Sequence, residues 1–350
     1  MPRSKQSSGR ITLVDVAKAA GVATMTVSRY LNQHPNVAEK TARRVKLAID
    51  KLGYSPNQAA RMLMGQPSKV IGLIVPDLTL SFFATVAHYV QQVARQRGYQ
   101  VWIAATNSMA EADLSAVSQM KQHQVDGILL VPSPGVGVND ATIDGLPMVA
   151  LCRPLVGTRV DAITLENRKN AWDATQHLLS HGYQKIACLG LEENIYTMSE
   201  RLAGYHDAMR EHRLPALPYV ECKDSATAVR AIRRLLAAKN PVQALITFTS
   251  LTTIHAIEAL DELDVSIPRD IALIGFDEIE LAGVLKPRLT VVKEPADELG
   301  QRAARYLLDV IESEEPPAGM TITIPASLLI RESCGCKMAS RSSQSAASKN

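Results

Sequence analysis

The spacing of apolar residues near the N-terminus predicts two short helices joined by a tight turn, over residues 12–32. Thr12 can cap the first helix, and Asp15 three residues later completes a capping box. Gly21 supplies the turn, because glycine adopts a positive φ without a steric cost. In the second helix, apolar residues recur at i, i+3 and i+4 from Val27 and therefore face inward. The outward positions near its start are Thr24, Met25, Ser28 and Arg29.

A third amphipathic helix is expected at about residues 39–52, closing an all-α headpiece that ends at residue 54. The segment that follows, 55–65, has a good N-cap in Ser55, a favourable first residue in Pro56 and a glycine stop. It therefore reads as a helix of about two turns, too short to be stable alone in water. We expect a hinge helix and linker over residues 55–69 that depend on a partner for their order.

From Val70 the pattern changes to apolar runs alternating with amphipathic stretches, which predicts a parallel, doubly wound α/β core. The runs are VIGLIV (70–75), VWIAA (101–105), VDGILLV (125–131), MVAL (148–151), KIACLG (185–190), ALITF (244–248) and IALIGF (271–276). The helical stretches are 83–97, 111–123, 168–181, 199–213, 225–238 and 250–263.

The number of apolar runs is too large for one modest sheet, so we expect two similar lobes, at about 70–165 and 166–290. Residues 291–333, with a helix near 296–313 and one strand near 320–330, should cross between them. The core would end at about residue 338, and the low-complexity tail 339–350 is expected to be disordered. Ligands of such folds bind at the carboxyl ends of strands, here between the lobes.

Charge is spread unevenly along the 350 residues, although the formal net charge is only +3. Residues 1–66 hold eleven Lys/Arg and three Asp/Glu, a net of +8, and the remainder carries −5. A basic helix-turn-helix on an acidic body indicates a DNA-binding module joined to a second function. No signal peptide or membrane span is apparent, and five scattered cysteines are typical of a reducing compartment. We therefore expect a cytoplasmic protein.

Several motifs together resemble the lactose-repressor (LacI/GalR) family of bacterial transcriptional regulators. They are TLVDVAKAAGVATMTVSRYLN, LGYSPNQAARML, IGLIVPD, VDGILL, RLAGYHDAM and IALIGFDE, and they occur in the family's order over residues 11–333. The run MTVSRYL also resembles the gluconate-repressor branch. The resemblance implies a homodimeric or tetrameric repressor of a catabolic operon, with a core like that of periplasmic sugar-binding proteins. It would bind a palindromic operator and respond to a small effector.

The resemblance also assigns DNA contacts. It implies base reading by Thr24, Met25 and Arg29, with the neighbouring Ser28 also facing the DNA. Phosphate contacts would come from Thr12, Thr26, Asn32, Thr41 and Asn57. In the hinge helix, Leu63 would wedge into the minor groove, and Ala60 would allow two hinges to approach closely.

For the effector, the resemblance implies a pocket built from Phe82, Phe83, Arg153, Arg201, Thr249, Phe276 and Asp277. Arg201 would grip the ligand and Asp277 would accept from its hydroxyls. Thr249-Ser250, Leu80-Ser81 and Cys152-Arg153 depart from the family's common residues at these places. Two arginines favour a sugar acid such as gluconate or a ketogluconate, since a carboxylate entering a cleft needs a paired cation. A neutral sugar or a purine is the alternative.

Other chemistry was weighed and not favoured. The chain has no dinucleotide or phosphate-loop motif, and we expect no cofactor. His177 and His181 lie at i, i+4, but histidine near a helix C-terminus is favoured by the helix dipole anyway, so no metal is expected. Cys334-Gly-Cys336 reads as a plain strand end rather than a chelate or a strained link. A DNA-tethered enzyme lacks a nucleophile or acid–base set, and a periplasmic solute-binding protein would lack the basic head. The effector's role as inducer or corepressor stays open.

Overall fold

The computed structural model describes residues 11–31, 37–54, 67–313 and 318–336. Contacts divide the chain into two units, residues 1–68 and 69–350, and each is described by itself. The first unit has three helices, α1 (Leu13–Ala20), α2 (Thr24–Leu31) and α3 (Glu39–Leu52). They enclose a small core centred on Val16, Val27 and Val45, which are fully buried. The predicted headpiece fold is therefore confirmed.

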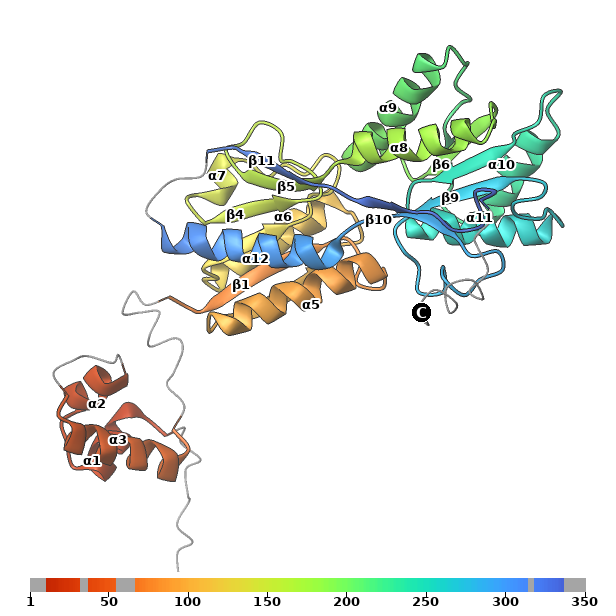
Figure 1. Cartoon of the computed structure of the whole chain (residues 1–350). Coiled ribbons are helices and arrows are strands. Elements are labelled where there is room, and N and C mark those ends of the chain that lie inside the picture. Colours follow the sequence, from red (N-terminus) through yellow and green to blue (C-terminus); the bar gives the residue numbers. More distant parts are fainter. Residues whose placement is uncertain (1–10, 32–36, 55–66, 314–317, 337–350) are drawn as a thin grey trace, which may run out of the picture. The chain divides into compact units, whose positions relative to one another are not determined.

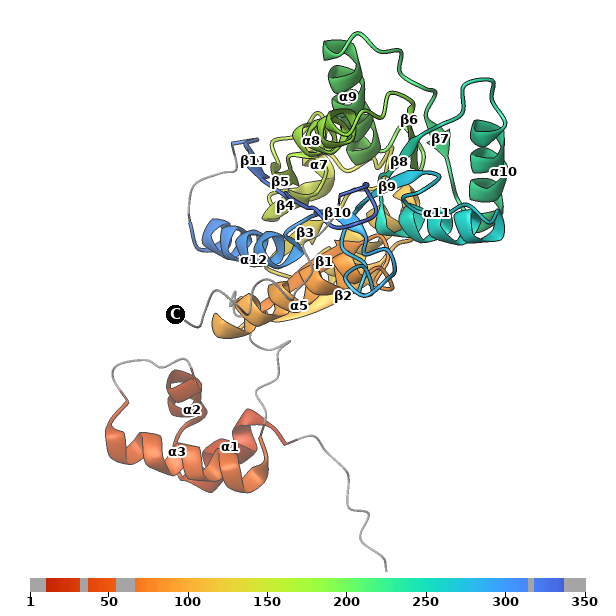
Figure 2. The same cartoon turned by 45° about the vertical axis from the view of Figure 1, so that its right-hand side comes forward.

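The second unit contains two six-stranded sheets, shown in Figures 1 and 2. The first has the order β11-β5-β4-β3-β1-β2 and is parallel throughout. Its strands are β1 (Val70–Val75), β2 (Gln100–Ala105), β3 (Gly127–Leu130), β4 (Met148–Leu151), β5 (Asp161–Leu165) and β11 (Thr321–Ile324).

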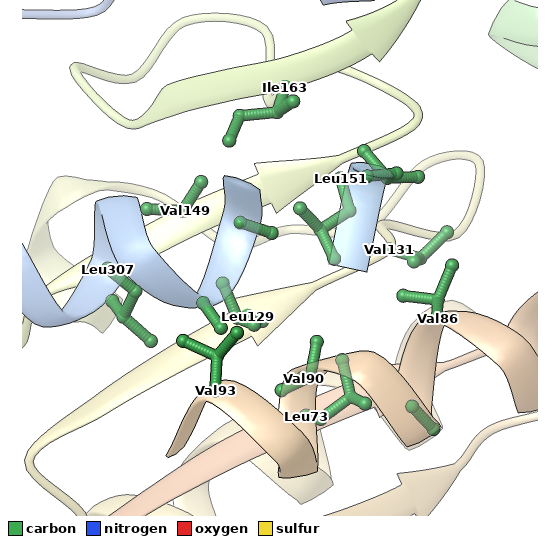
Figure 3. Close-up of a cluster of buried hydrophobic side chains, with 14 of the residues drawn as sticks. Leu73, Val86, Val90, Val93, Leu129, Val131, Val149, Leu151, Ile163 and Leu307 are labelled. Carbon is green, nitrogen blue, oxygen red and sulfur yellow. The ribbon is translucent and has the colours of Figure 1, made fainter. Parts of the chain in front are cut away.

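Helices cover both faces of this first sheet. On one face lie α5 (Ser81–Gln96) and α12 (Ala296–Glu312), side by side in Figure 1. Figure 3 shows the core beneath them, where Val90 and Leu307 pack on Leu73 and Leu129. The other face is covered by α6 (Ala110–Gln122) and the short α7 (Asp140–Ile143). The strands bear apolar residues on both faces because both faces are buried.

The second sheet has the order β12-β10-β9-β8-β6-β7, parallel except for the β10–β12 pair. Its strands are β6 (Ile186–Gly190), β7 (Val220–Glu221), β8 (Ala244–Thr247), β9 (Ala272–Phe276), β10 (Thr290–Lys293) and β12 (Ser327–Leu329). One face packs on α8 (Asn167–Ser180) and α9 (Tyr196–Glu211), and the other on α10 (Ser225–Leu236) and α11 (Ser250–Glu262). The two doubly wound parallel-sheet lobes are confirmed.

The C-terminal part of the core differs from the sequence prediction. The single strand expected near 320–330 is two strands, because β11 extends the first sheet and β12 extends the second. β5, β7 and β10 were not predicted as strands, and β10 belongs to the second lobe although it lies in the expected crossing segment. These strands are two to five residues long, and so short a run carries little periodicity. As a result the chain passes between the lobes three times.

Candidate functional site

The second helix of the headpiece presents a polar surface. Met25 is 63% exposed, and Thr24 and Arg29 are also exposed, whereas Val27 is fully buried against α1 and α3. Thr26, Ser28 and Thr41 are half-buried. Within residues 11–31 and 37–54, no carboxylate forms an ion pair with Arg29. The guanidinium is therefore available to an outside partner.

The turn between α1 and α2 is held by a residue that the sequence analysis missed. Arg44 on α3 donates to the carbonyl oxygens of Ala20 (2.6 Å) and Gly21 (3.0 Å), satisfying the C-terminus of α1. At the other end of α1, Thr12 and Asp15 form the predicted capping box. Thr12 donates its hydroxyl proton to Asp15 (2.7 Å), so this hydroxyl already has a protein partner. The Arg44 contacts thus fasten the turn that leads into α2 to α3.

Four of the expected DNA contacts lie outside the described residues. They are Asn32, Asn57, Ala60 and Leu63, and the expected hinge helix 55–65 lies there with them.

The core contains a pocket between its two lobes, at the carboxyl ends of the strands. It encloses a volume of about 110 Å³. Small ligands of doubly wound folds bind at this edge of the sheet. Six of the seven expected effector residues line it, namely Phe82, Phe83, Arg153, Arg201, Thr249 and Asp277. Phe276 does not line the pocket. It is fully buried, and its ring lies 4.3 Å from the Arg201 guanidinium carbon, so it supports that arginine from behind.

Arg201 is bound by the protein itself. Its side chain is 4% exposed, and Nε donates to Asn167 Oδ1 at 2.9 Å. One terminal nitrogen donates to the Phe248 carbonyl oxygen and the other to Glu294. Three of the five N–H donors of a guanidinium are thereby used. Because the carboxyl groups of Glu294 and Asp277 lie beside it, Arg201 offers the pocket hydrogen bonds rather than an uncompensated cation.

Glu294 and Asp277 place two carboxyl groups beside this arginine. Burial raises the pKa of Glu294 well above its ordinary value; Arg201 acts in the opposite direction, and the carboxyl of Asp277 raises the pKa further. Asp277 has φ +64, a conformation rare outside glycine, and its Oδ2 accepts from Ser250 N at 3.3 Å. Its Oδ1 is buried and has no hydrogen-bond partner among the described residues.

Arg153 is the second cation of the pocket and has a different environment. It follows β4, and one terminal nitrogen donates to the Pro132 carbonyl oxygen at 3.0 Å. Its Nε is buried with no partner, and no carboxylate of the described chain forms an ion pair with it. Burial lowers the pKa of Arg153, opposed by Cys152 and Asp113. Even so, a guanidinium stays protonated. The pocket therefore holds a cation that forms no ion pair with a carboxylate of the described chain, and the buried carboxyl of Asp113 acts on it only at longer range.

The remaining pocket residues shape the walls. Phe82 and Phe83 are half-buried and meet edge to face, with ring centroids 5.2 Å apart. Thr249 caps α11, since its hydroxyl oxygen accepts from Thr252 N at 3.0 Å. Burial raises the pKa of Cys152 to about 12, so its thiol stays protonated at neutral pH. These side chains give the pocket apolar faces and leave polar recognition to the arginines and carboxyls.

Glu294 was missed by the sequence analysis. It follows β10 directly, at the same edge of the second sheet as Asp277. A carboxylate after a short β-branched run was the available signal, but the run was not recognised as a strand.

Two family profiles match the chain. The profile described as bacterial regulatory proteins, lacI family, covers residues 12–57, and a periplasmic binding protein-like domain covers residues 175–334. The ribose operon repressor of Halalkalibacterium halodurans is 31% identical over 321 residues, spanning 92% of this chain and 96% of that protein. This chain belongs to the LacI family. The transcriptional repressor PurR of Aliivibrio fischeri is 30% identical over 316 residues, 87% of this chain and 93% of PurR.

Solved structures of the LacI family show the same fold. The lac repressor dimer bound to operator and the anti-inducer ONPF has a TM-score of 0.83 at 25% identity, covering 93% of this chain and 99% of that one. A ribose operon repressor structure from Burkholderia thailandensis has a TM-score of 0.67 at 30% identity, covering 75% and 98%. As a LacI-family member, the protein is a ligand-responsive transcriptional repressor and not an enzyme. Among its described helices, none combines the length and apolarity needed to cross a bilayer.

Proposed function

We propose that this repressor responds to a sugar acid such as gluconate or a ketogluconate, and that its dimer binds a palindromic operator of a catabolic operon. The observation that carries the effector assignment is Arg153, a cation in the pocket with no carboxylate partner in the described chain. Arg153 is half-buried, and a cation without an ion pair there is only partly compensated, so the site gains free energy from a ligand that brings a negative charge.

The different surroundings of Arg201 and Arg153 favour a sugar acid over a neutral sugar as the ligand. Arg201 lies beside the carboxyl groups of Glu294 and Asp277, so a neutral ligand would already be served by its remaining N–H groups. Arg153 would then remain unpaired. A carboxylate at Arg153 forms a charge-assisted hydrogen bond, which is about twice as strong as a neutral one.

The rest of the pocket suits the polyhydroxylated part of the ligand. Asp277 Oδ1 is a buried acceptor that lacks a donor among the described residues, and a ligand hydroxyl supplies one. Phe82 and Phe83 offer rings against which an apolar sugar face can pack.

The operator proposal rests on the exposed surface of α2. Arg29 at this surface suits bidentate contact with guanine, and one headpiece reads one half-site. A two-fold dimer then requires a palindromic operator. The effector changes operator affinity only if it binds one lobe arrangement better than the other, since tight binding to both would shift nothing.

Calorimetry on the full chain tests the effector assignment. We expect gluconate or a ketogluconate to bind, and glucose, ribose and hypoxanthine to bind weakly or not at all. Arg153→Met keeps an apolar stem and removes the charge. It should weaken acid binding by about 10–150-fold, the equivalent of about 1.5–3 kcal/mol for a hydrogen bond to a charged group.

Arg159→Met is the matched control, because Arg159 is exposed on the same lobe and does not line the pocket. Its acid affinity should equal that of the wild type. Tight binding of a neutral sugar or a purine, unaffected by Arg153→Met and without response to any acid, would refute the sugar-acid assignment. The assignment to the repressor family would stand in that case.

A further inference from the structure

Two histidines and two cysteines from distant parts of the chain meet at the surface of the second lobe. His177 and His181 lie at the C-terminal end of α8, and Cys334 and Cys336 lie in the turn after β12. One ligand atom from each residue can be chosen so that all four lie within 4.8 Å of one another. None of the four lines the effector pocket, so this cluster is a separate feature of the molecule.

The local backbone places the two histidines on one face of α8 and turns both cysteine sulfurs toward that helix. Residues four apart on a helix share a face, and the two imidazole centroids are 4.9 Å apart. Gly335 separates the cysteines and has φ +96, which lets the turn direct both sulfurs toward α8. A Cβ at this glycine would lie 2.7 Å from the Tyr183 hydroxyl oxygen. The Tyr183 ring in turn stacks on His181, with centroids 6.3 Å apart.

Three of the six distances between the ligand atoms approach those of a tetrahedral set. His177 Nε2 lies 3.2 Å from Cys334 Sγ and 3.7 Å from Cys336 Sγ, and His181 Nε2 lies 3.1 Å from Cys336 Sγ. Zinc bonds of about 2.3 Å to sulfur and about 2.0–2.1 Å to nitrogen, at tetrahedral angles, place ligand atoms about 3.4–3.8 Å apart. All four ligand atoms lie within 4.8 Å of one another, so binding an ion would draw the widest pair together by up to about 1 Å.

We propose that His177, His181, Cys334 and Cys336 form a structural zinc site that fastens the C-terminal turn to α8. Two thiolates and two imidazoles are a donor set that tetrahedral Zn²⁺ prefers. Four protein ligands leave no open position, so the site would be structural rather than catalytic. The sequence analysis favoured no metal because it treated the histidine pair and the cysteine pair separately.

The cysteine turn is already held in place by polar contacts. Thr290 Oγ1 donates to Cys334 Sγ at 3.2 Å, the kind of outer hydrogen bond that orients a metal-binding thiolate. Ser333 donates its hydroxyl proton to the Leu273 carbonyl oxygen at 2.7 Å and accepts from Thr290 N at 2.8 Å. These bonds anchor the turn to β9 and β10. An ion would therefore meet ligands that are largely preorganised.

Metal analysis of the full chain, purified under reducing conditions, tests the proposal. We expect about one zinc per chain, loss of thermal stability after chelation and recovery on adding Zn²⁺, because a ligand of the folded state stabilises it. Co²⁺ added to the chelated chain should give the thiolate charge-transfer band and the strong visible bands of a tetrahedral site.

Cys336→Ser and His181→Ala should each weaken metal binding by more than the roughly 10–100-fold expected for loss of an outer-shell partner. Both residues lie at the surface, and circular dichroism of each variant checks its fold. His212→Ala and Cys222→Ala are the controls, since neither belongs to the cluster, and both should bind metal as the wild type does.

Three results would overturn the proposal. The first is a reduced wild-type chain that takes up neither zinc nor tetrahedral cobalt. The second is equal uptake by the wild type, Cys336→Ser and His181→Ala, which would place the metal elsewhere. The third is mass spectrometry showing a Cys334–Cys336 disulfide in the freshly isolated protein.

Discussion

Replacing Arg201 with methionine should lower the free energy of unfolding of the core by an amount that depends on pH. Arg201 is 4% exposed and donates to Asn167, Phe248 and Glu294. Methionine keeps an apolar stem but leaves the neighbouring carboxyl pair, Glu294 and Asp277, with one uncompensated negative charge. Removing one partner of a buried ion pair lowers the free energy of unfolding by about 3–5 kcal/mol. The folded variant can limit that cost by binding one more proton than the wild type.

The free energy needed to protonate a carboxyl group sets the pH dependence. Protonating a carboxyl of ordinary pKa 4.5 costs at most about 3.4 kcal/mol at pH 7 and about 1.4 kcal/mol at pH 5.5. Because the folded variant binds the extra proton, it loses stability relative to the wild type as pH rises. The destabilisation by Arg201→Met should thus shrink by up to about 2 kcal/mol between pH 7 and pH 5.5.

Urea unfolding followed by circular dichroism and by the fluorescence of Trp172 on α8 measures the effect. Adding Glu294→Gln to Arg201→Met should recover about 2–3 kcal/mol at pH 7 and little at pH 5.5, since a neutral amide then replaces the second carboxyl and the repulsion of Asp277 by a like charge is gone. Arg97→Met is the control, because its pair with Asp309 is 37% and 62% exposed and is worth at most about 1 kcal/mol. A penalty for Arg201→Met that is equal at both pH values, or no recovery in the double variant, would refute the reasoning.

Three further predictions concern DNA binding and helix packing. Arg29→Ala should remove about 1–3 kcal/mol of the preference for the operator over a scrambled duplex. Gel shifts at two salt concentrations measure this preference. An equal loss of affinity for both duplexes would exclude Arg29 from base reading. Leu63→Ala should weaken operator binding without changing the melting temperature of the free core, and unchanged affinity and DNA bending would contradict a wedge. Gly204→Ala should destabilise the second lobe by about 1–3 kcal/mol or more, because its Cβ would lie 2.0 Å from the Arg168 carbonyl oxygen of α8. Gly283→Ala is the control for the melting curves, because a Cβ at Gly283 would meet open space. Equal stability of the two variants would contradict the close packing at Gly204.

Much of the architecture was determined by the sequence alone, because local periodicity reports which face of an element is buried. Alternating apolar runs and amphipathic stretches predicted two doubly wound lobes, and both are present. The capping box of Thr12 and Asp15 was legible because a cap involves only neighbouring residues. The resemblance to the LacI family implied that Arg153 and Asp277 belong to the pocket, and both line it.

Only the tertiary structure decided how these groups are paired. It showed that Arg201 pairs with Glu294, whereas Arg153 forms no ion pair within the described chain. It also joined His177 to Cys334 across 157 positions of the sequence. Periodicity cannot report such pairings, because it records the burial of one segment and carries no information about which distant segment covers it. Charge compensation and metal coordination depend on that second segment, so they are settled only when the whole chain folds.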